Sequence, residues 1–268
     1  MPITWSYRGL SSPFVMNPAL GAGQFGRPSS TVSPHSAAET YDGFASAVEG
    51  LAEGCVDLSV PVVGGNVSLY NDSETGPVAP TPTLALLGTK NGYSAPPTTV
   101  SGEGELVLVE PAEWVAGSDI GSDDPHALGG SLLLENFGGS DRFPAAPAAP
   151  GALVDAVARV ADLEATLATH DVSDGGLAVA LAELVTDEAG ADVTLPDRVA
   201  AFEETPGRLV VQTTDPEAVA EIAGDLPVLR LGDVTTDGAL SLAVGDDAVE
   251  MDADAIRDLR GVIERELA

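Results

Sequence analysis

Residues 208–234, RLVVQTTDPEAVAEIAGDLPVLRLGDV, contain the pattern that decides the fold class. The apolar runs at 208–213 and 228–234 are typical of buried strands, and residues 216–223 between them indicate a helix. A strand, a helix and a second strand in succession indicate helices packed on a sheet. This stretch therefore predicts an α+β fold, that is, a layered α/β arrangement.

The same alternation extends outward over most of the chain. We expect helices at four further places, namely 41–56, 152–167, 177–185 and 253–267. Further strands are expected at 58–63, 81–87, 105–110 and 240–244. Cys55, the only cysteine, shares the apolar face of the first helix and is expected in a core. Residues 91–102 are rich in Pro, Ser and Thr and predict a linker between two units.

The charge of the chain is strongly acidic. Asp and Glu total 42 against 11 Lys and Arg, which gives a net charge of −31, and Lys90 is the only lysine. Such a surface suits the molar-salt cytoplasm of a halophile, where the Debye length is about 3 Å. Nucleic-acid binding is not expected because it needs basic patches. No membrane association is expected either, since no run approaches the ~20 apolar residues of a span.

Residues 1–38 differ from the rest in composition. They contain no Asp or Glu, whereas residues 39–268 contain all 42. They are rich in Ser, Pro and Gly and show no helical or strand period. We expect this segment to be poorly ordered, and we hypothesise that it is a frameshift or truncation product joined near residue 38.

The stretch PVVGGNVSLYN, residues 61–71, is the first candidate site. An apolar run ends in Gly64 and Gly65, and the polar residues Asn66 and Ser68 follow. A strand that runs into a glycine turn with polar side chains is a common way to build a phosphate or metal site. The alternative is a strand that ends in an ordinary loop.

HDVSDGG, residues 170–176, is the second candidate. His170, Asp171 and Asp174 lie just before Gly175 and a predicted helix, and carboxylates near a helix N-terminus can hold Mg²⁺ while the helix amides face a phosphate. The alternative is that Asp174 caps the helix and the glycines form a tight turn.

Two shorter patterns could contribute to an anion site. In EETPGR, residues 203–208, Arg208 could face an anionic ligand, because Arg suits phosphate. The alternative is an exposed turn with a local ion pair. Residues 129–131, GGS, could form a backbone nest for an anion, or simply a turn.

Together, PVVGGNVSLYN, HDVSDGGLAVALAEL and FEETPGR resemble, in order and spacing, the synthetase (large) subunit of phosphoribosylformylglycinamidine synthase. This family belongs to the aminoimidazole ribonucleotide synthetase-like superfamily. The resemblance is to the C-terminal portion of the subunit. It implies a partial second ATP-binding-type domain at 39–97, a complete second C-terminal-type domain at 103–250, and a C-terminal helix at 251–268.

The resemblance also implies an activity. The family uses ATP and Mg²⁺ to activate the amide oxygen of formylglycinamide ribonucleotide in purine biosynthesis, and ammonia then displaces phosphate to give the amidine. The ammonia comes from a separate glutaminase subunit, with a small accessory subunit. The chain would therefore be a cytoplasmic carbon–nitrogen ligase, or a fragment of one, with these two subunits and the missing N-terminal half of the synthetase as partners.

Residue roles follow from the matched motifs. The resemblance implies that Gly64 and Gly65 bind nucleotide, that Asn66 is a Mg²⁺ ligand and that Ser68 contacts substrate. His170, Asp171, Asp174, Gly175 and Arg208 carry over only as an auxiliary phosphate or nucleotide site.

The departures from the family pattern limit this assignment. The acidic segment that contacts ATP is replaced by residues 29–38, which contain no Asp, and the first half with the catalytic His is missing. We therefore assign no catalytic residue and expect no turnover by the chain alone. The alternatives are a non-catalytic nucleotide-binding or interaction module of the same fold, or another superfamily member such as a selenophosphate synthetase or thiamine-phosphate kinase.

Overall fold

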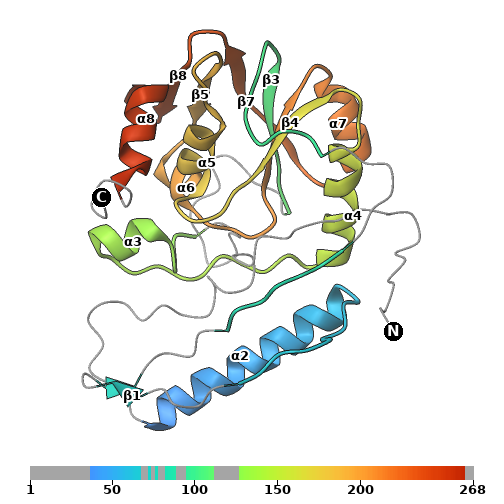
Figure 1. Cartoon of the computed structure of the whole chain (residues 1–268), viewed down its shortest axis with the longest axis vertical. Helices are drawn as coiled ribbons and strands as arrows, with labels where there is room; N and C mark the ends of the chain where they lie inside the picture. Colours follow the sequence, from blue (N-terminus) through green and yellow to red (C-terminus); the bar gives the residue numbers. More distant parts are fainter. Residues whose placement is uncertain are drawn as a thin grey trace.

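A computed structural model describes residues 37–67, 72–73, 76–77, 82–88, 95–111 and 127–262 of the chain. Within these ranges the polypeptide forms a seven-stranded mixed sheet with helices on both faces (Figure 1). The predicted α+β class is therefore confirmed. Among the described helices, none is long and apolar enough to span a membrane.

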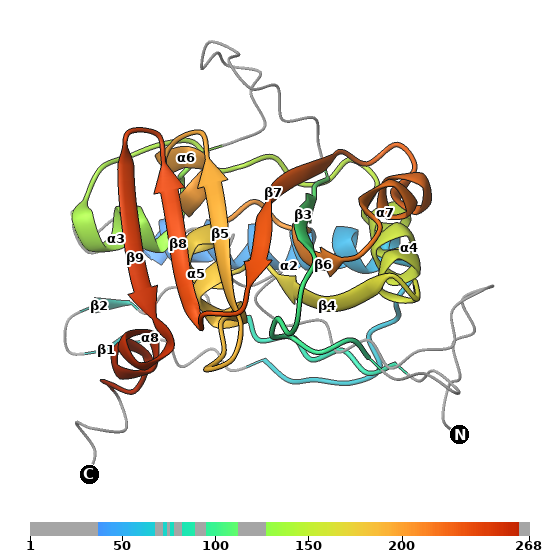
Figure 2. The same ribbon diagram turned by 90° about the horizontal axis from the view of Figure 1, so that it is seen from above.

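The sheet has the strand order β4-β6-β3-β7-β5-β8-β9 (Figure 2). In that order the strands are β4 (Thr166–Asp171), β6 (Leu209–Thr213), β3 (Glu105–Val109), β7 (Val228–Thr235), β5 (Gly190–Leu195), β8 (Ala239–Val244) and β9 (Asp247–Asp252). β5 and β8 are parallel, and the other neighbouring pairs are antiparallel. Strand β3 lies between β6 and β7. The two strands of the stretch 208–234 therefore pair with β3 on either side and not with each other.

The strand period divides the core into two layers. On β3, Leu106 and Leu108 face one cluster while Val107 and Val109 face the other, as alternation along a strand requires. The first cluster is covered by α5 (Gly176–Leu184) and α6 (Arg198–Phe202), and the second by α4 (Pro150–Ala161) and α7 (Pro216–Ala223). Both faces of the central strands are thus buried, which explains their continuous apolar sequences.

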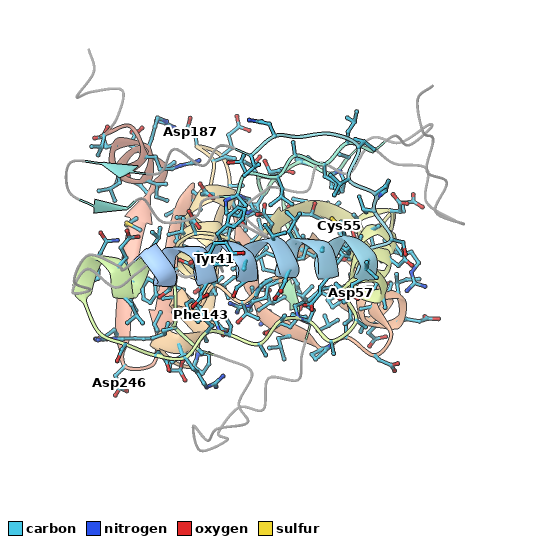
Figure 3. All side chains as sticks on the ribbon, turned by 90° about the horizontal axis from the view of Figure 1, so that it is seen from below. Tyr41, Cys55, Asp57, Phe143, Asp187 and Asp246 are labelled. Atoms are coloured by element: carbon cyan, nitrogen blue, oxygen red, sulfur yellow. The ribbon has the colours of Figure 1, made fainter. Side chains whose placement is uncertain are left out.

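The predicted helix at 41–56 is present as α2 (Ala37–Asp57). In Figures 1 and 3 it lies across the side of the molecule opposite the sheet. Ala47 is buried in this helix, but Tyr41, Val48 and Val56 are exposed, and Cys55 is half-buried rather than deep in a core.

The two strands predicted around α2 are wrong. Residues 60–67 and 82–88 have no regular secondary structure, and Val63 and Leu87 are 80% and 93% exposed. A strand needs a neighbouring strand for its backbone hydrogen bonds, and the described residues supply none here. Among the described residues of this region, β1 (Asp72–Ser73) and β2 (Gly76–Pro77) form a short hairpin.

The described part of the predicted linker, residues 95–102, packs against the sheet unit. The carbonyl of Pro97 accepts a hydrogen bond from the Thr169 amide (2.9 Å), and the Val100 amide donates to the Leu184 carbonyl (2.9 Å). The buried Gln212 side chain donates to the Ser101 carbonyl (2.7 Å) and accepts from its amide (3.2 Å). This segment is therefore held by the sheet unit, where Val100 is buried in the first cluster.

The helix expected at 152–167 ends earlier, and β4 follows it directly. The Thr166 hydroxyl donates to the Val160 carbonyl (2.7 Å), and this hydrogen bond connects the start of β4 to the end of α4. Within the described residues, seven short elements were not predicted: β1, β2, α3 (Leu132–Phe137), β4, β5, α6 and β9. The C-terminal helix is confirmed as α8 (Ala253–Arg260), and residues beyond 262 lie outside the described part.

Candidate functional site

The first candidate motif is an exposed segment after α2. Gly64, Gly65 and Asn66 are all exposed, and a Cβ placed on either glycine would meet no atom within 4 Å. Gly65 has φ +152°, a conformation that residues with a side chain rarely adopt. The backbone is therefore open to close approach by another molecule. Ser68 lies outside the described residues.

The second motif is the turn from β4 into α5. Gly175 and Gly176 have φ +86° and +69°, so both use the left-handed conformation that glycine tolerates. A Cβ on Gly176 would lie 2.8 Å from the carbonyl oxygens of Ala201 and Glu203. The glycine thus lets the start of α5 pack directly against the chain that leads into EETPGR.

The polar residues of this turn have mostly internal partners. The Ser173 hydroxyl donates to the Asp171 carboxylate, while Asp174 is exposed. The ring of His170 contacts the Asp171 carbonyl through Nδ1 (2.7 Å) and Glu183 through Nε2 (3.5 Å). The side chain of Asp174 does not cap α5, whose N-cap is Gly175, so the capping alternative is not supported.

Glu204 joins the second motif to the GGS turn at 129–131. Its Oε1 accepts hydrogen bonds from the amides of Gly175 and Leu132, each 2.8 Å long. Leu132 is the first residue of α3, and the Ser131 hydroxyl caps that helix. A carboxylate of the protein itself therefore lies where the sequence predicts that amides face an anion.

Arg208 is buried beside two carboxylates. Its guanidinium lies 3.2 Å from Glu203 Oε1 and 3.7 Å from Glu110 Oε2, and all three side chains are at most 2% exposed. The Thr205 hydroxyl donates to the other oxygen of Glu203 (2.9 Å). The alternative of a local ion pair is therefore present, although it is buried rather than exposed. Contact between Arg208 and a ligand stays a prediction.

The donor atoms at hand do not make a complete metal centre. Within the described ranges, no group of three or more His, Cys, Asp or Glu side chains could hold a metal ion. Asn66 offers one amide oxygen, which suits Mg²⁺ but is insufficient alone. A metal-binding role of Asn66 and a nucleotide-binding role of the two glycines stay predictions.

The fold unites the second, third and fourth motifs. The residue that links them, Glu204, was visible in the sequence only as part of an acidic pair before a Pro-Gly turn. No periodicity could identify its partners, because Gly175 and Leu132 are 29 and 72 positions away. The contact of Glu183 with His170 was likewise not predicted, because nothing in the sequence distinguishes Glu183 from other acidic residues of a helix.

Comparison with known proteins gives one family match and several relatives. Residues 115–245 match the model of the AIR synthase related protein, C-terminal domain. The chain is 65% identical over 238 residues to the phosphoribosylformylglycinamidine synthase subunit PurL of Halorubrum lacusprofundi, a match that covers 86% of this chain and 30% of that protein. It is 55% identical over 230 residues to PurL of Natronomonas pharaonis, covering 84% and 31%.

A solved structure shows the same fold. Thermotoga maritima PurL complexed with FGAR matches with a TM-score of 0.55 at 18% identity, over 89% of this chain and 40% of that one. The chain spans about a third of the length of the curated relatives it matches.

Proposed function

Because the chain is a relative of the phosphoribosylformylglycinamidine synthase subunit PurL over most of its length, we propose that it supplies the C-terminal portion of such a synthetase. The reaction would be the ATP-dependent conversion of formylglycinamide ribonucleotide and ammonia to formylglycinamidine ribonucleotide, with ADP and phosphate released. The observation that supports this is the 65% identity to the Halorubrum protein over 238 residues.

The proposed contribution of the first motif is one wall of the nucleotide site. The open backbone at Gly64 and Gly65 would approach the nucleotide, the Asn66 amide oxygen would serve as one Mg²⁺ ligand, and Ser68 would contact substrate. Mg²⁺ would supply charge neutralisation at the phosphates. The other metal ligands would have to come from outside the described residues.

The turn at 170–176 would form part of an auxiliary phosphate or nucleotide site. Asp171, Asp174 and Gly175 lie at the end of β4, and His170 is tied to α5 through Glu183. Arg208 would act from the buried side rather than at the surface. Because Arg208 is only 3% exposed, we propose that it helps to hold this site in position.

The proposed partners are the remaining N-terminal part of the synthetase, a glutaminase subunit that delivers ammonia, and a small accessory subunit. The proposed location is the cytoplasm of a halophile, since the relatives include proteins of halophilic archaea.

An assay of the purified chain in molar KCl tests the activity. With ATP, Mg²⁺, formylglycinamide ribonucleotide and ammonium, we expect no substrate-dependent ADP release by the chain alone. Addition of the N-terminal two thirds of the Halorubrum protein should restore release. Turnover by the chain alone would contradict the expectation, and failure with the added part would count against the proposed synthetase role.

A non-catalytic nucleotide-binding module is the second candidate, favoured by the incomplete metal donor set. Calorimetric titration with ADP and Mg²⁺ addresses it. The Asn66→Ala variant should lose the binding that belongs to the first motif, while the matched Asn136→Ala variant on α3 should keep it. Binding by the chain without reconstituted activity would favour this candidate over the synthetase fragment.

A further inference from the structure

We propose that Glu204 is the positioning residue of the turn at 173–176, and that it makes the GGS, HDVSDGG and EETPGR motifs one unit. This inference rests on the proposed auxiliary phosphate or nucleotide site and adds a residue to it. Glu204 acts through the turn, because its carboxylate bonds the backbone of Gly175 and no contact with a ligand is needed.

Two hydrogen bonds to Glu204 hold the turn in place. One carboxylate oxygen receives the amides of Gly175 and Leu132, both at 2.8 Å, so it fixes the starts of two helices relative to each other. Hydrogen bonds with one ionised partner are roughly twice as strong as neutral ones. Glu204 is also only partly exposed, which limits competition from water.

The backbone on both sides of Glu204 is held in place by buried contacts. Its neighbour Glu203 is fully buried and paired with Arg208, and Thr205 donates to the same Glu203 carboxylate. Gly176 packs without a side chain against the carbonyls of Ala201 and Glu203. The segment 203–205 therefore cannot shift without disturbing the buried ion pair or the start of α5.

The consequence concerns the polar residues of the turn. Asp174 directly precedes Gly175 and Asp171 lies four residues before it, so the position of their carboxylates depends on where the Gly175 amide is held. Loss of the Glu204 charge should loosen the turn while the sheet stays intact. The ligand class that the turn would then bind less well is the phosphate group of a nucleotide.

Residue-resolved amide exchange in molar KCl tests the positioning role without any ligand. The variant is Glu204→Gln, which keeps the size of the side chain, and the matched control is Glu164→Gln at an exposed position. We expect the Gly175 and Leu132 amides to exchange on the order of tenfold faster in Glu204→Gln only. The core amides of Val193 and Val211 should keep their wild-type rates in both variants.

A conservative variant distinguishes charge from side-chain length. Glu204→Asp keeps the carboxylate but is one methylene shorter, so it should protect one of the two amides and not both. Unchanged exchange at both amides in Glu204→Gln would overturn the proposal, and so would uniform loss of protection across the sheet, which would indicate a general structural role.

Calorimetric titration with ADP and Mg²⁺ separates this inference from the proposed function. If the wild type binds, the same titration in an Asn66→Ala background removes the first-motif site. There Glu204→Gln should bind several-fold more weakly, and Glu164→Gln should match Asn66→Ala alone. Equal affinity of Asn66→Ala with and without Glu204→Gln would overturn the link to ligand binding. If Asn66→Ala does not bind, the proposed auxiliary site fails, whereas the exchange data still decide whether Glu204 positions the turn.

Discussion

Arg208 shows how a scarce cation is used in a very acidic chain. The chain has 11 Lys and Arg against 42 Asp and Glu, so its excess negative charge must be screened by water and salt. Arg208 is nevertheless buried between Glu203 and Glu110, where burial without a charge partner would be costly. The arrangement holds EETPGR against the sheet rather than offering the guanidinium to solvent.

Replacement of Arg208 should therefore destabilise the protein. Arg208→Met removes one partner of a buried ion pair and leaves two carboxylates without it, which costs about 3–5 kcal/mol. The control Arg198→Met breaks the exposed pair with Asp247 and should cost at most about 1 kcal/mol. Urea unfolding in molar KCl measures both, and equal losses would contradict the structural role of Arg208.

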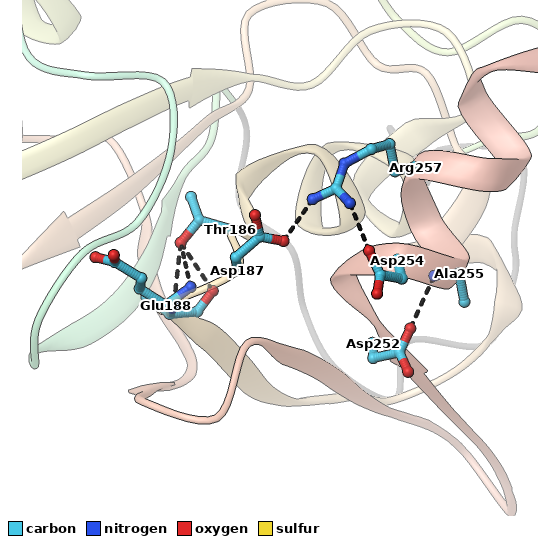
Figure 4. Close-up of polar contacts among 8 residues, drawn as sticks. Thr186, Asp187, Glu188, Asp252, Asp254, Ala255 and Arg257 are labelled. Carbon is cyan, nitrogen blue, oxygen red and sulfur yellow. Dashed lines mark hydrogen bonds and ion pairs between the residues drawn. The ribbon is translucent and has the colours of Figure 1, made fainter.

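Helix α8 contacts the sheet unit through polar groups at its surface and through one buried apolar side chain. Asp252 accepts from the Ala255 amide (2.8 Å) at the start of the helix, and Arg257 bridges Asp187 and Asp254 (Figure 4). The hydrogen bond that Arg257 donates to Asp187 is the main cause that raises the pKa of Arg257 above its ordinary value. Ile256 is the buried residue of this helix.

Loss of the cap should loosen α8 more than the sheet. Asp252→Ala removes the acceptor of the Ala255 amide and should destabilise the helix by about 1 kcal/mol. Amide exchange along 253–260 should become faster, while Glu250→Ala, an exposed change on β9, should leave it unaltered. Identical exchange in the two variants would show that the cap does not hold the helix.

The whole molecule carries a net charge of −31 at neutral pH. Most described ion pairs lie at exposed positions, so the remaining repulsion is set largely by the salt concentration. Molar salt shortens the Debye length to about 3 Å, against about 10 Å at 0.1 M. Stability in dilute buffer should therefore be much lower than in the salt of a halophile.

A salt series tests this at the scale of the molecule. The free energy of unfolding, from urea titrations followed by circular dichroism, should fall steadily as KCl decreases from about 3 M to about 0.1 M. Choline chloride at equal ionic strength is the control, and it should protect to a similar extent if screening is the cause. A stability independent of KCl would refute the interpretation of the surface charge.

The sequence by itself determined the fold class and most elements of the sheet unit. Helix α7, whose predicted bounds are the observed ones, and strands β3, β6 and β7 follow from spacing within a few residues. Such periods report which side of an element is buried, and that information is local. The motifs could also be identified from the sequence, because each is a short continuous stretch.

Only the tertiary structure decided what those stretches contact. The apolar run at 58–63 does not form a strand, because pairing depends on a neighbour that the run itself cannot specify. The link from Glu204 to Gly175 and Leu132 depends on two turns that are distant in sequence but adjacent in the fold. The spacing of apolar side chains along the sequence indicates which residues are buried. Hydrogen-bond partners instead depend on which distant segments the fold brings together.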